Sequence, residues 1–348
     1  LNSSLRAFDN TDVMEFFERL GVPLKTERGN RVFPQSDRAA DVVDAMMRCL
    51  HDQSVEVRTN TAVSELLIAD HAACGVRLKD GTQIDADAVI LALGGASYPA
   101  TGSAGEGYDL ARSAGHTIAR VFPALVPLVT EEEWGKELQG LSLRNVRASV
   151  YCAGKKEREA FGEMLFAHYG VTGPIILQLS RRVSELLSEG HERLELQLNL
   201  KPALSHEVLR DRVDRDFTKY QRKQLCNAMI DLLPKRLIVP VLHAAGISLE
   251  LSAGQTSARA REYLVHVMQA LPMTIIGTRP LAEAIVTAGG VETSEINPRT
   301  MESKIVRNLY FAGELVDVDA FTGGYNLQAA FSMGHAAGCH SVWNLERE

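Results

Sequence analysis

The sequence has few of the features that mark secreted, metal-binding or membrane-spanning proteins. Its 348 residues include five cysteines, with no Cys-x-x-Cys pair and no histidine at metal-ligand spacing. We therefore expect no metal site and no redox dithiol, and we expect buried thiols in a reducing, cytoplasmic compartment. The longest apolar run, 88–93, is far shorter than the roughly 20 residues that cross a bilayer, so no membrane partner is expected.

Positive charge is also scarce. The chain has 37 Lys and Arg against 44 Asp and Glu, a net charge of -7. A nucleic-acid-binding domain is expected to show a basic patch or stripe. The pairs Lys155-Lys156 and Arg181-Arg182 are short and have Glu nearby, which is typical of a solvated face. The composition therefore predicts no nucleic-acid partner.

The residues that are present indicate an α/β protein of about two domains. Hydrophobic residues make up 45% of the chain, enough for sizeable cores. Apolar residues at helical spacing predict helices over about 10–20 and 37–50, with caps offered by Asn10, Thr11 or Asp12. Val55 and Val57 alternate as in a short strand. Asp80-Gly81 lies between strand-like segments and predicts a hairpin.

Two further strand-like runs end in glycine. They are Leu91-Ala92-Leu93-Gly94-Gly95 and Phe311-Ala312-Gly313-Glu314. Continuous apolar runs are typical of strands buried on both faces, and ligands of open α/β sheets bind beyond the carboxyl ends of the strands. Glycine there permits close backbone approach, and the carboxylate of Glu314 can hold a sugar hydroxyl. A structural turn explains either run taken singly; together they predict neighbouring strands in one domain.

The middle of the chain has a different character. Pro123 and Pro127 bracket apolar residues, as in a crossover into a new domain. Residues 123–200 are β-rich, residues 201–270 are helical and highly charged, and the earlier pattern returns from 284. The sequence therefore predicts a crossover into a new domain near Pro123, and a return of the first pattern from 284.

Several longer motifs lie in order along essentially the whole chain. They are Gly29-Asn30-Arg31-Val32-Phe33-Pro34, Thr101-Gly102-Ser103, Phe166-Ala167-His168-Tyr169-Gly170, Ala284-Ile285-Val286-Thr287, Asn308-Leu309-Tyr310-Phe311-Ala312-Gly313-Glu314 and Thr322-Gly323-Gly324-Tyr325-Asn326-Leu327-Gln328. Together these motifs resemble the bacterial aminoacetone-oxidase-like flavoproteins, a family that includes proteins proposed to reduce bile acids. That family has a glutathione-reductase-type FAD fold.

The resemblance implies a split, Rossmann-like FAD-binding domain made of 1–122 and 284–348, interrupted by an inserted substrate domain, 123–283. It implies an FAD-dependent oxidoreductase that moves a hydride between a small organic substrate and either NAD(P)H or oxygen. The helix that starts after Gly324 is expected to direct its free N–H groups toward the N1–C2=O edge of the flavin. The residues expected to bind FAD are Val63, Ala92, Gly94, Gly95, Gly313, Glu314, Gly323, Gly324, Tyr325, Asn326, Leu327 and Gln328.

His168 and Tyr169 are the expected catalytic residues. They lie in a glycine-flanked segment of the insert, and a side chain that gives a proton beside a flavin needs a pKa near the working pH. The alternative is that His168 makes a hydrogen bond that orders its loop.

The sequence departs from the family pattern at two places. Leu93 stands where the family commonly has Thr, so one hydroxyl near the cofactor is lost. The family begins with a strand, a G-x-G-x-x-G turn and a helix that hold the pyrophosphate, and no such turn opens this sequence. We therefore expect the chain to lack stoichiometric FAD. The alternatives are a flavin-fold binding protein without turnover and an RNA-modifying flavoenzyme, and the acidic composition counts against the second.

Overall fold

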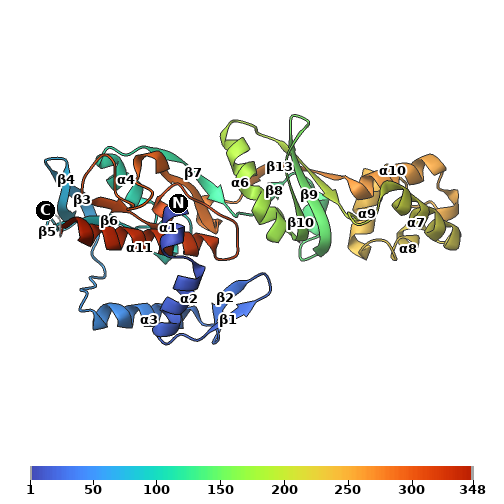
Figure 1. Cartoon of the computed structure of the whole chain (residues 1–348). Helices are drawn as coiled ribbons and strands as arrows, with labels where there is room; N and C mark the ends of the chain where they lie inside the picture. The colour runs from blue at the N-terminus through green and yellow to red at the C-terminus, as the bar shows by residue number, and fades with distance from the viewer. Residues whose placement is uncertain (1, 346–348) are drawn as a thin grey trace. The chain divides into compact units, whose positions relative to one another are not determined.

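The computed structural model describes residues 2–345. The chain forms two compact units (Figure 1). Unit 1 consists of the segments up to Val121 and from Val286 onward, and unit 2 is the intervening segment Phe122–Ile285. None of the helices within 2–345 is both long and apolar enough to cross a membrane.

Two parallel strands lie at the centre of unit 1. They are β6 (Val89–Leu91) and β15 (Leu309–Phe311), with Leu91 opposite Phe311. All three residues of β15 are buried, and α11 (Tyr325–Leu345) packs against this strand. The predicted neighbouring strands are thus confirmed. The prediction that β6 is buried on both faces is wrong at Ile90, which is 39% exposed.

A second sheet of unit 1 is antiparallel. It contains β3 (Val63–Ala69), β4 (Ala72–Leu78) and β5 (Gln83–Asp85). Gly81 has a φ of 90° in the turn after β4, a conformation that suits glycine, so the predicted hairpin is confirmed. Of the cysteines, Cys152 in unit 2 is buried, whereas Cys74 on β4 is exposed; the prediction of buried thiols is wrong there.

Two of the first helices of unit 1, α2 (Asn10–Arg19) and α3 (Ala39–Asp52), pack on a small core around Phe17. The helix α1 (Asn2–Ala7) contacts α11 instead. The strands β1 (Leu24–Glu27) and β2 (Arg31–Pro34) form a hairpin between α2 and α3. Asp9, one residue before the predicted caps, caps α2 in a capping box with Asp12. The strand predicted at Val55 and Val57 is wrong, because this exposed segment has no partner strand to supply hydrogen bonds.

A further two-stranded sheet pairs two strands that are far apart in the sequence. One is β7 (Ile118–Ala124) and the other is β14 (Val286–Val291), which pair in a two-stranded sheet. A side chain at Gly289 would collide with the carbonyl oxygen of Arg120, so the close approach of these strands requires glycine at that position. The helix α4 (Glu106–Ser113) precedes β7 and contributes Tyr108 and Leu110 to the core.

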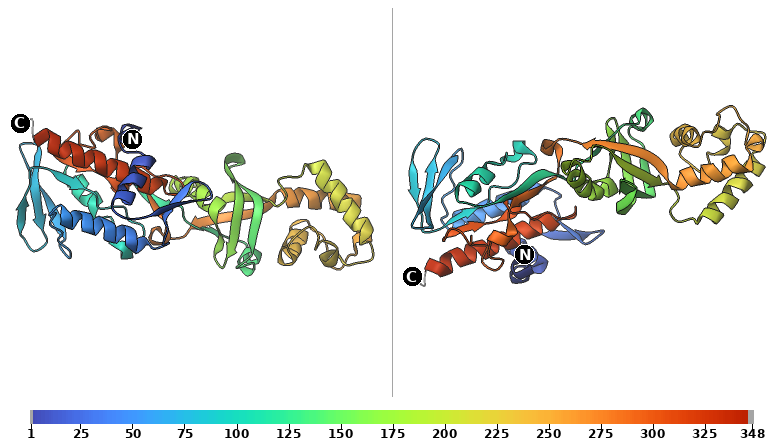
Figure 2. Two further views of the ribbon diagram at one scale, coloured as in Figure 1. Left: turned by 60° about the horizontal axis from the view of Figure 1, so that its bottom comes forward. Right: turned by 90° about the horizontal axis from the view of Figure 1, so that it is seen from above.

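Unit 2 contains a closed barrel, drawn mostly in green (Figures 1 and 2). The helix α6 (Pro174–Ser188) packs against the barrel strand β10, and it was not foreseen from the sequence. In sheet order the barrel strands are β10 (Lys155–Ala167), β11 (Gly170–Thr172), β8 (Leu128–Thr130), β13 (Leu271–Thr278), β12 (Leu194–Asn199) and β9 (Ser142–Cys152).

The rest of unit 2 is mainly helical. The short α5 (Glu133–Glu137) follows β8, and four helices lie between β12 and β13. These four are α7 (His206–Lys219), α8 (Leu225–Ala228), α9 (Lys235–Ala244) and α10 (Ala258–Gln269). Their buried residues, such as Phe217 and Leu264, join one hydrophobic core with the barrel.

Candidate functional site

The ends of β6 and β15 bring several predicted cofactor-binding residues together. The backbone N–H of Ala312 donates to the carbonyl of Leu91 at 3.0 Å, so the segments that follow β6 and β15 leave the sheet side by side. Beyond this bond lie Gly94 and Gly95 on the first segment and Gly313 and Glu314 on the second. Glu314 lies in the short helical turn η5 (Gly313–Leu315).

Thr287 connects these two strand ends. Its Oγ1 accepts hydrogen bonds from the backbone N–H groups of Ala96 at 2.9 Å and Ser97 at 3.0 Å. Its own N–H donates to the carboxylate of Glu314, which also accepts from the Ser97 hydroxyl at 3.2 Å. A Cβ on Gly95 would collide with Thr287 Oγ1 and lie 2.8 Å from Glu314 Oε1. Glycine is therefore required at position 95.

Tyr108 lies beside this network. Burial raises its pKa to about 12, and the negative charges of Glu314 and Asp317 contribute to the shift. The phenol is therefore protonated at neutral pH. Its hydroxyl is buried next to the side chain of Thr287, which opposes the shift, although the two make no hydrogen bond of normal geometry. The phenol therefore lies beside the glycine-rich strand ends.

The predicted glycine turn before α11 has the conformation that glycine favours. Gly323 and Gly324 have φ values of 126° and 93°. Asn326 closes the turn, because its side chain accepts from the N–H of Ala320 at 2.8 Å and donates to the carbonyl of the same residue at 2.9 Å. The Gln328 side chain donates to the Phe8 carbonyl at 3.3 Å. Both side chains therefore make hydrogen bonds to backbone groups of the protein itself.

Tyr325 and Leu327 are instead 61% and 64% exposed, and they lie in the first turn of α11. The first N–H groups of a helix have no partner within it, so this turn can receive an anion or an electron-rich carbonyl. Val63, the remaining predicted contact, begins β3 and packs on the core formed by β6 and β15. All predicted cofactor-binding residues thus belong to unit 1.

The predicted catalytic residues belong to unit 2. His168 and Tyr169 form the turn between β10 and β11, and their rings meet edge to face at 4.8 Å. The Arg279 guanidinium lies 5.0 Å from the centroid of the Tyr169 ring and donates to both carboxylate oxygens of Glu283, at 2.8 and 2.6 Å. Burial raises the pKa of Tyr169, so its hydroxyl is protonated at neutral pH.

Sequence reasoning missed Arg279 and Glu283, although their opposite charges four residues apart were a usable signal. It also missed a buried cluster in unit 1. His116 contacts Glu295 through Nδ1 at 3.0 Å and the Ser303 hydroxyl through Nε2 at 2.7 Å. The Ser303 oxygen accepts from the N–H groups of Ile305 and Val306. Because the serine is buried and fully engaged, this cluster is structural.

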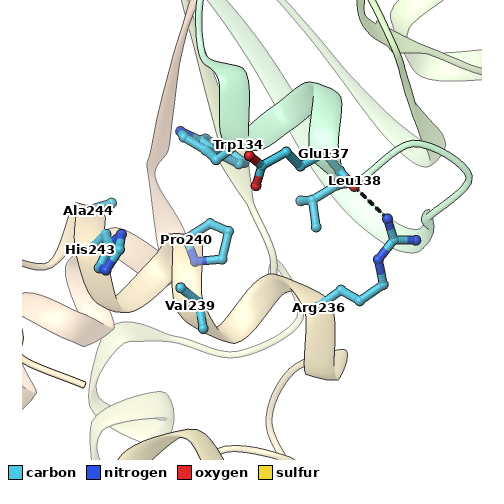
Figure 3. A pocket seen from close by; sticks show the side chains of 8 residues that line it. All are labelled: Trp134, Glu137, Leu138, Arg236, Val239, Pro240, His243 and Ala244. Atoms are coloured by element: carbon cyan, nitrogen blue, oxygen red, sulfur yellow. Dashed lines mark hydrogen bonds between the residues drawn. The ribbon is translucent and has the colours of Figure 1, made fainter. Parts of the chain in front are cut away.

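A hollow of about 370 Å³ lies between α5 and α9 in unit 2 (Figure 3). Trp134, Leu138 and Pro240 supply apolar walls. The Arg236 guanidinium at its rim donates to the backbone carbonyls of Glu137, at 2.6 Å, and Gln139, at 3.2 Å. None of the residues predicted to bind cofactor or substrate lines this hollow.

The family model for the HI0933-like protein Rossmann domain matches residues 1–340. A 3-dehydro-bile acid delta(4,6)-reductase of Clostridium scindens is 33% identical over 96% of this chain and 80% of that protein. Ribosomal RNA dihydrouridine synthases of Haemophilus influenzae and Escherichia coli are 27% and 29% identical, over 97% and 96% of this chain and 80% of each protein. The chain belongs to the HI0933-like family.

The predicted resemblance and α/β fold class are confirmed, and the chain is a flavoprotein-type oxidoreductase. The prediction of no nucleic-acid partner is wrong. Two relatives along nearly the whole chain are named for ribosomal RNA, so the composition does not exclude RNA. The physical reason is that a net charge averages over the whole surface, whereas a polyanion contacts only part of it.

Proposed function

We propose that this protein is an FAD-dependent reductase that saturates a carbon–carbon double bond conjugated to a carbonyl group, with NAD(P)H as the electron donor. The names of the relatives support this reaction. A delta(4,6) double bond in a 3-dehydro bile acid is conjugated to a ketone, and a dihydrouridine is a uridine saturated beside a ring carbonyl. The observation that carries the proposal is the paired strand ends of β6 and β15, joined by Thr287 and Glu314.

The residues of unit 1 fit FAD. Gly94 and Gly313 present backbone without side chains beyond the two strands, Gly95 packs against Thr287 and Glu314, and Val63 packs on the same core. Gly323 and Gly324 with the first turn of α11 offer free N–H groups. When bound, FAD would supply the hydride that the double bond accepts. The positive end of α11 would favour the negative charge of a reduced flavin held there.

The protein must also supply a proton, because saturating a double bond adds both a hydride and a proton. We assign the proton to the Tyr169 hydroxyl, with His168 as its neighbour. The raised pKa of Tyr169 keeps this proton in place at neutral pH. The positive charge of Arg279 beside the ring favours the phenolate that remains after transfer. Glu283 binds Arg279 on both carboxylate oxygens and so fixes the direction of the guanidinium.

The test is turnover with a conjugated ketone. The purified protein is supplied with FAD and NADPH without oxygen, and a steroid 4,6-dien-3-one is compared with the saturated 3-oxosteroid. We expect donor oxidation with the conjugated ketone alone and a product saturated at carbon–carbon bonds with its ketone intact. Reduction of the ketone itself contradicts the proposal. A flavin band without turnover on this ketone or on uridine-containing RNA indicates a flavin-binding protein that is not a reductase.

A further inference from the structure

The helical part of unit 2 differs in charge from the rest of the chain. Residues 201–270 hold eleven Lys and Arg against seven Asp and Glu, a surplus of four positive charges. Because the whole chain carries -7, the remaining residues carry -11. A basic segment in an acidic protein is a candidate surface for a polyanion, since association depends on the local field.

Two acidic side chains of α7 form ion pairs with arginines of the same helical part. Asp214 pairs with Arg261 of α10 at 2.6 Å, and Asp216 pairs with Arg212 at 2.8 Å. These contacts neutralise arginines within the helical part. They leave the basic residues at the end of α7 available to a partner.

The clearest concentration of charge is the turn after α7, Lys219–Lys223, here called the basic turn. Lys219, Arg222 and Lys223 are exposed, and no acidic residue occurs from 217 to 230. The ammonium groups of Lys219 and Lys223 lie 4.5 and 4.3 Å from the centroid of the Tyr220 ring, which holds them together. The Asp231 carboxylate accepts a hydrogen bond from the Tyr220 hydroxyl at 2.6 Å and lies 3.7 Å from the Lys219 ammonium group. It therefore balances one of the three positive charges.

The same helical part exposes aromatic rings. Tyr263, 52% exposed, and His266 lie on one face of α10 with ring centroids 6.1 Å apart and planes inclined by 21°. They line a hollow of about 740 Å³ together with Arg259 and His206. Glu262 also lines this hollow and bonds His206 at 2.6 Å; this hydrogen bond raises the pKa of His206, so the protonated ring and the carboxylate form an ion pair. Exposed rings beside cations are surfaces on which nucleic-acid bases stack.

We propose that residues 201–270 form an RNA-binding surface, in which the basic turn contacts phosphates and the Tyr263–His266 pair stacks with a base. An acidic peptide would use the charges but not the rings, whereas single-stranded RNA uses both. The inference deepens the proposed function, because it names RNA as the molecule that carries the conjugated double bond. Reduction of the RNA rests on the proposed function, whereas RNA binding does not, since binding requires no reduction.

The experiment measures binding of a fluorescein-labelled, uridine-rich single-stranded RNA to the full chain by anisotropy at several salt concentrations. The variant Lys219→Gln/Arg222→Gln/Lys223→Gln should bind more weakly. The slope of log affinity against log salt should become shallower by about 1.4, because each phosphate contact on a single strand releases about 0.7 counterion and two of the three charges are unbalanced. The control Arg144→Gln/Lys155→Gln/Arg158→Gln removes three exposed charges from the barrel and should keep the original slope.

A second variant separates stacking from charge. Tyr263→Ala should lower the affinity about tenfold with an unchanged salt slope, and Tyr263→Phe should bind normally. Equal effects of the two triple variants, or displacement of the RNA by polyglutamate as readily as by unlabelled RNA, would overturn the inference. A protein that reduces the free conjugated ketone but does not bind RNA also overturns it and leaves the proposed function intact. RNA binding without any reductase activity supports the inference and overturns the proposed function.

Discussion

Thr287 Oγ1 lies 2.9 Å from the backbone nitrogen of Ala96, so a residue at the start of β14 holds the loop that follows β6. The side chain of Thr287 is buried and accepts from a second N–H, that of Ser97. Thr287→Val keeps the shape and removes the acceptor. Each buried N–H left unsatisfied costs about 1–3 kcal/mol, so we expect a lower free energy of unfolding and weaker FAD binding.

Chemical denaturation and a flavin titration on the same protein measure both effects of Thr287→Val. Thr218→Val is the matched control, because Thr218 is exposed and its hydroxyl bonds only within α7. The control should change stability by no more than about 0.5 kcal/mol and leave FAD binding unchanged. Equal behaviour of the two variants would show that Thr287 does not position the glycine loop.

The start of α11 provides the second prediction. Gly324 has a φ of 93° and no atom within contact distance of an added Cβ, so Gly324→Val acts through the backbone alone. The strained turn should move the first N–H groups of α11. We expect weaker flavin binding and a more negative flavin reduction potential, because each contact to the charged ring that is lost costs about 1.5–3 kcal/mol.

Spectroelectrochemical titration measures that potential, and thermal unfolding measures stability on the same sample. Gly334→Ala is the control, since Gly334 lies within α11 in ordinary helical conformation with open space around it. It should be neutral or slightly stabilising. Lost stability with an unchanged potential in Gly324→Val would assign the turn a structural role only.

The third prediction concerns proton transfer. Tyr169→Phe retains the ring that Arg279 contacts at 5.0 Å and removes only the hydroxyl. We expect kcat for the conjugated ketone to fall by about 10²–10⁴-fold, the range of general acid catalysis, with unchanged FAD affinity. Steady-state kinetics measure the loss, and Tyr263→Phe, an exposed tyrosine on α10, is the control. Normal turnover by Tyr169→Phe together with a loss in His168→Gln would transfer the role to His168.

The fourth prediction concerns pH and the buried His116. Burial lowers the pKa of His116 below its ordinary value of 6.5, with the Glu295 contact opposing the shift. Below pH 6.5 the unfolded chain therefore takes up the proton before the folded protein does. The stability due to neutral His116 is complete above that pH and is lost as the pH falls toward the lower, folded value.

Urea denaturation at pH values from 8 down to about 5 tests this dependence. His116→Gln should be less stable than the natural protein at pH 8, by about 1–3 kcal/mol, but should lose less stability on acidification. His51→Gln replaces an exposed histidine and should leave the pH dependence unchanged. A His116→Gln curve parallel to that of the natural protein would contradict the argument.

Local sequence was sufficient where the structure depends on local chemistry. The apolar run of β6 followed by Gly94 and the turn at Gly81 were both readable, because strand burial and positive φ leave a direct residue signature. The strand predicted at Val55 and Val57 failed, because a strand needs a partner, and alternation in one segment does not specify one.

Contacts between distant residues were not readable. His116 and Glu295 are 179 positions apart, and Thr287 and Ala96 are 191 apart. The local sequence around one residue of such a pair does not predict which distant residue it contacts. The net charge led to the wrong prediction of no nucleic-acid partner for a related reason. It is a sum over the basic turn around Tyr220 and an acidic remainder, so neither is visible in it.

The β6–β15 pair has a consequence for folding. Leu91 and Phe311 are partners although they are 220 positions apart (311 minus 91), and a long disordered loop between them would resist closure. The backbone N–H of Ile285 donates to the carbonyl of Leu125 at 3.2 Å, so the folded unit 2 ties together the two ends of that loop. Folding of Phe122–Ile285 first would shorten the remaining loop about fourfold and lower its entropic cost by about 1.2 kcal/mol. The inserted unit thus favours an order of assembly in which the middle of the chain folds before the central sheet of unit 1 closes.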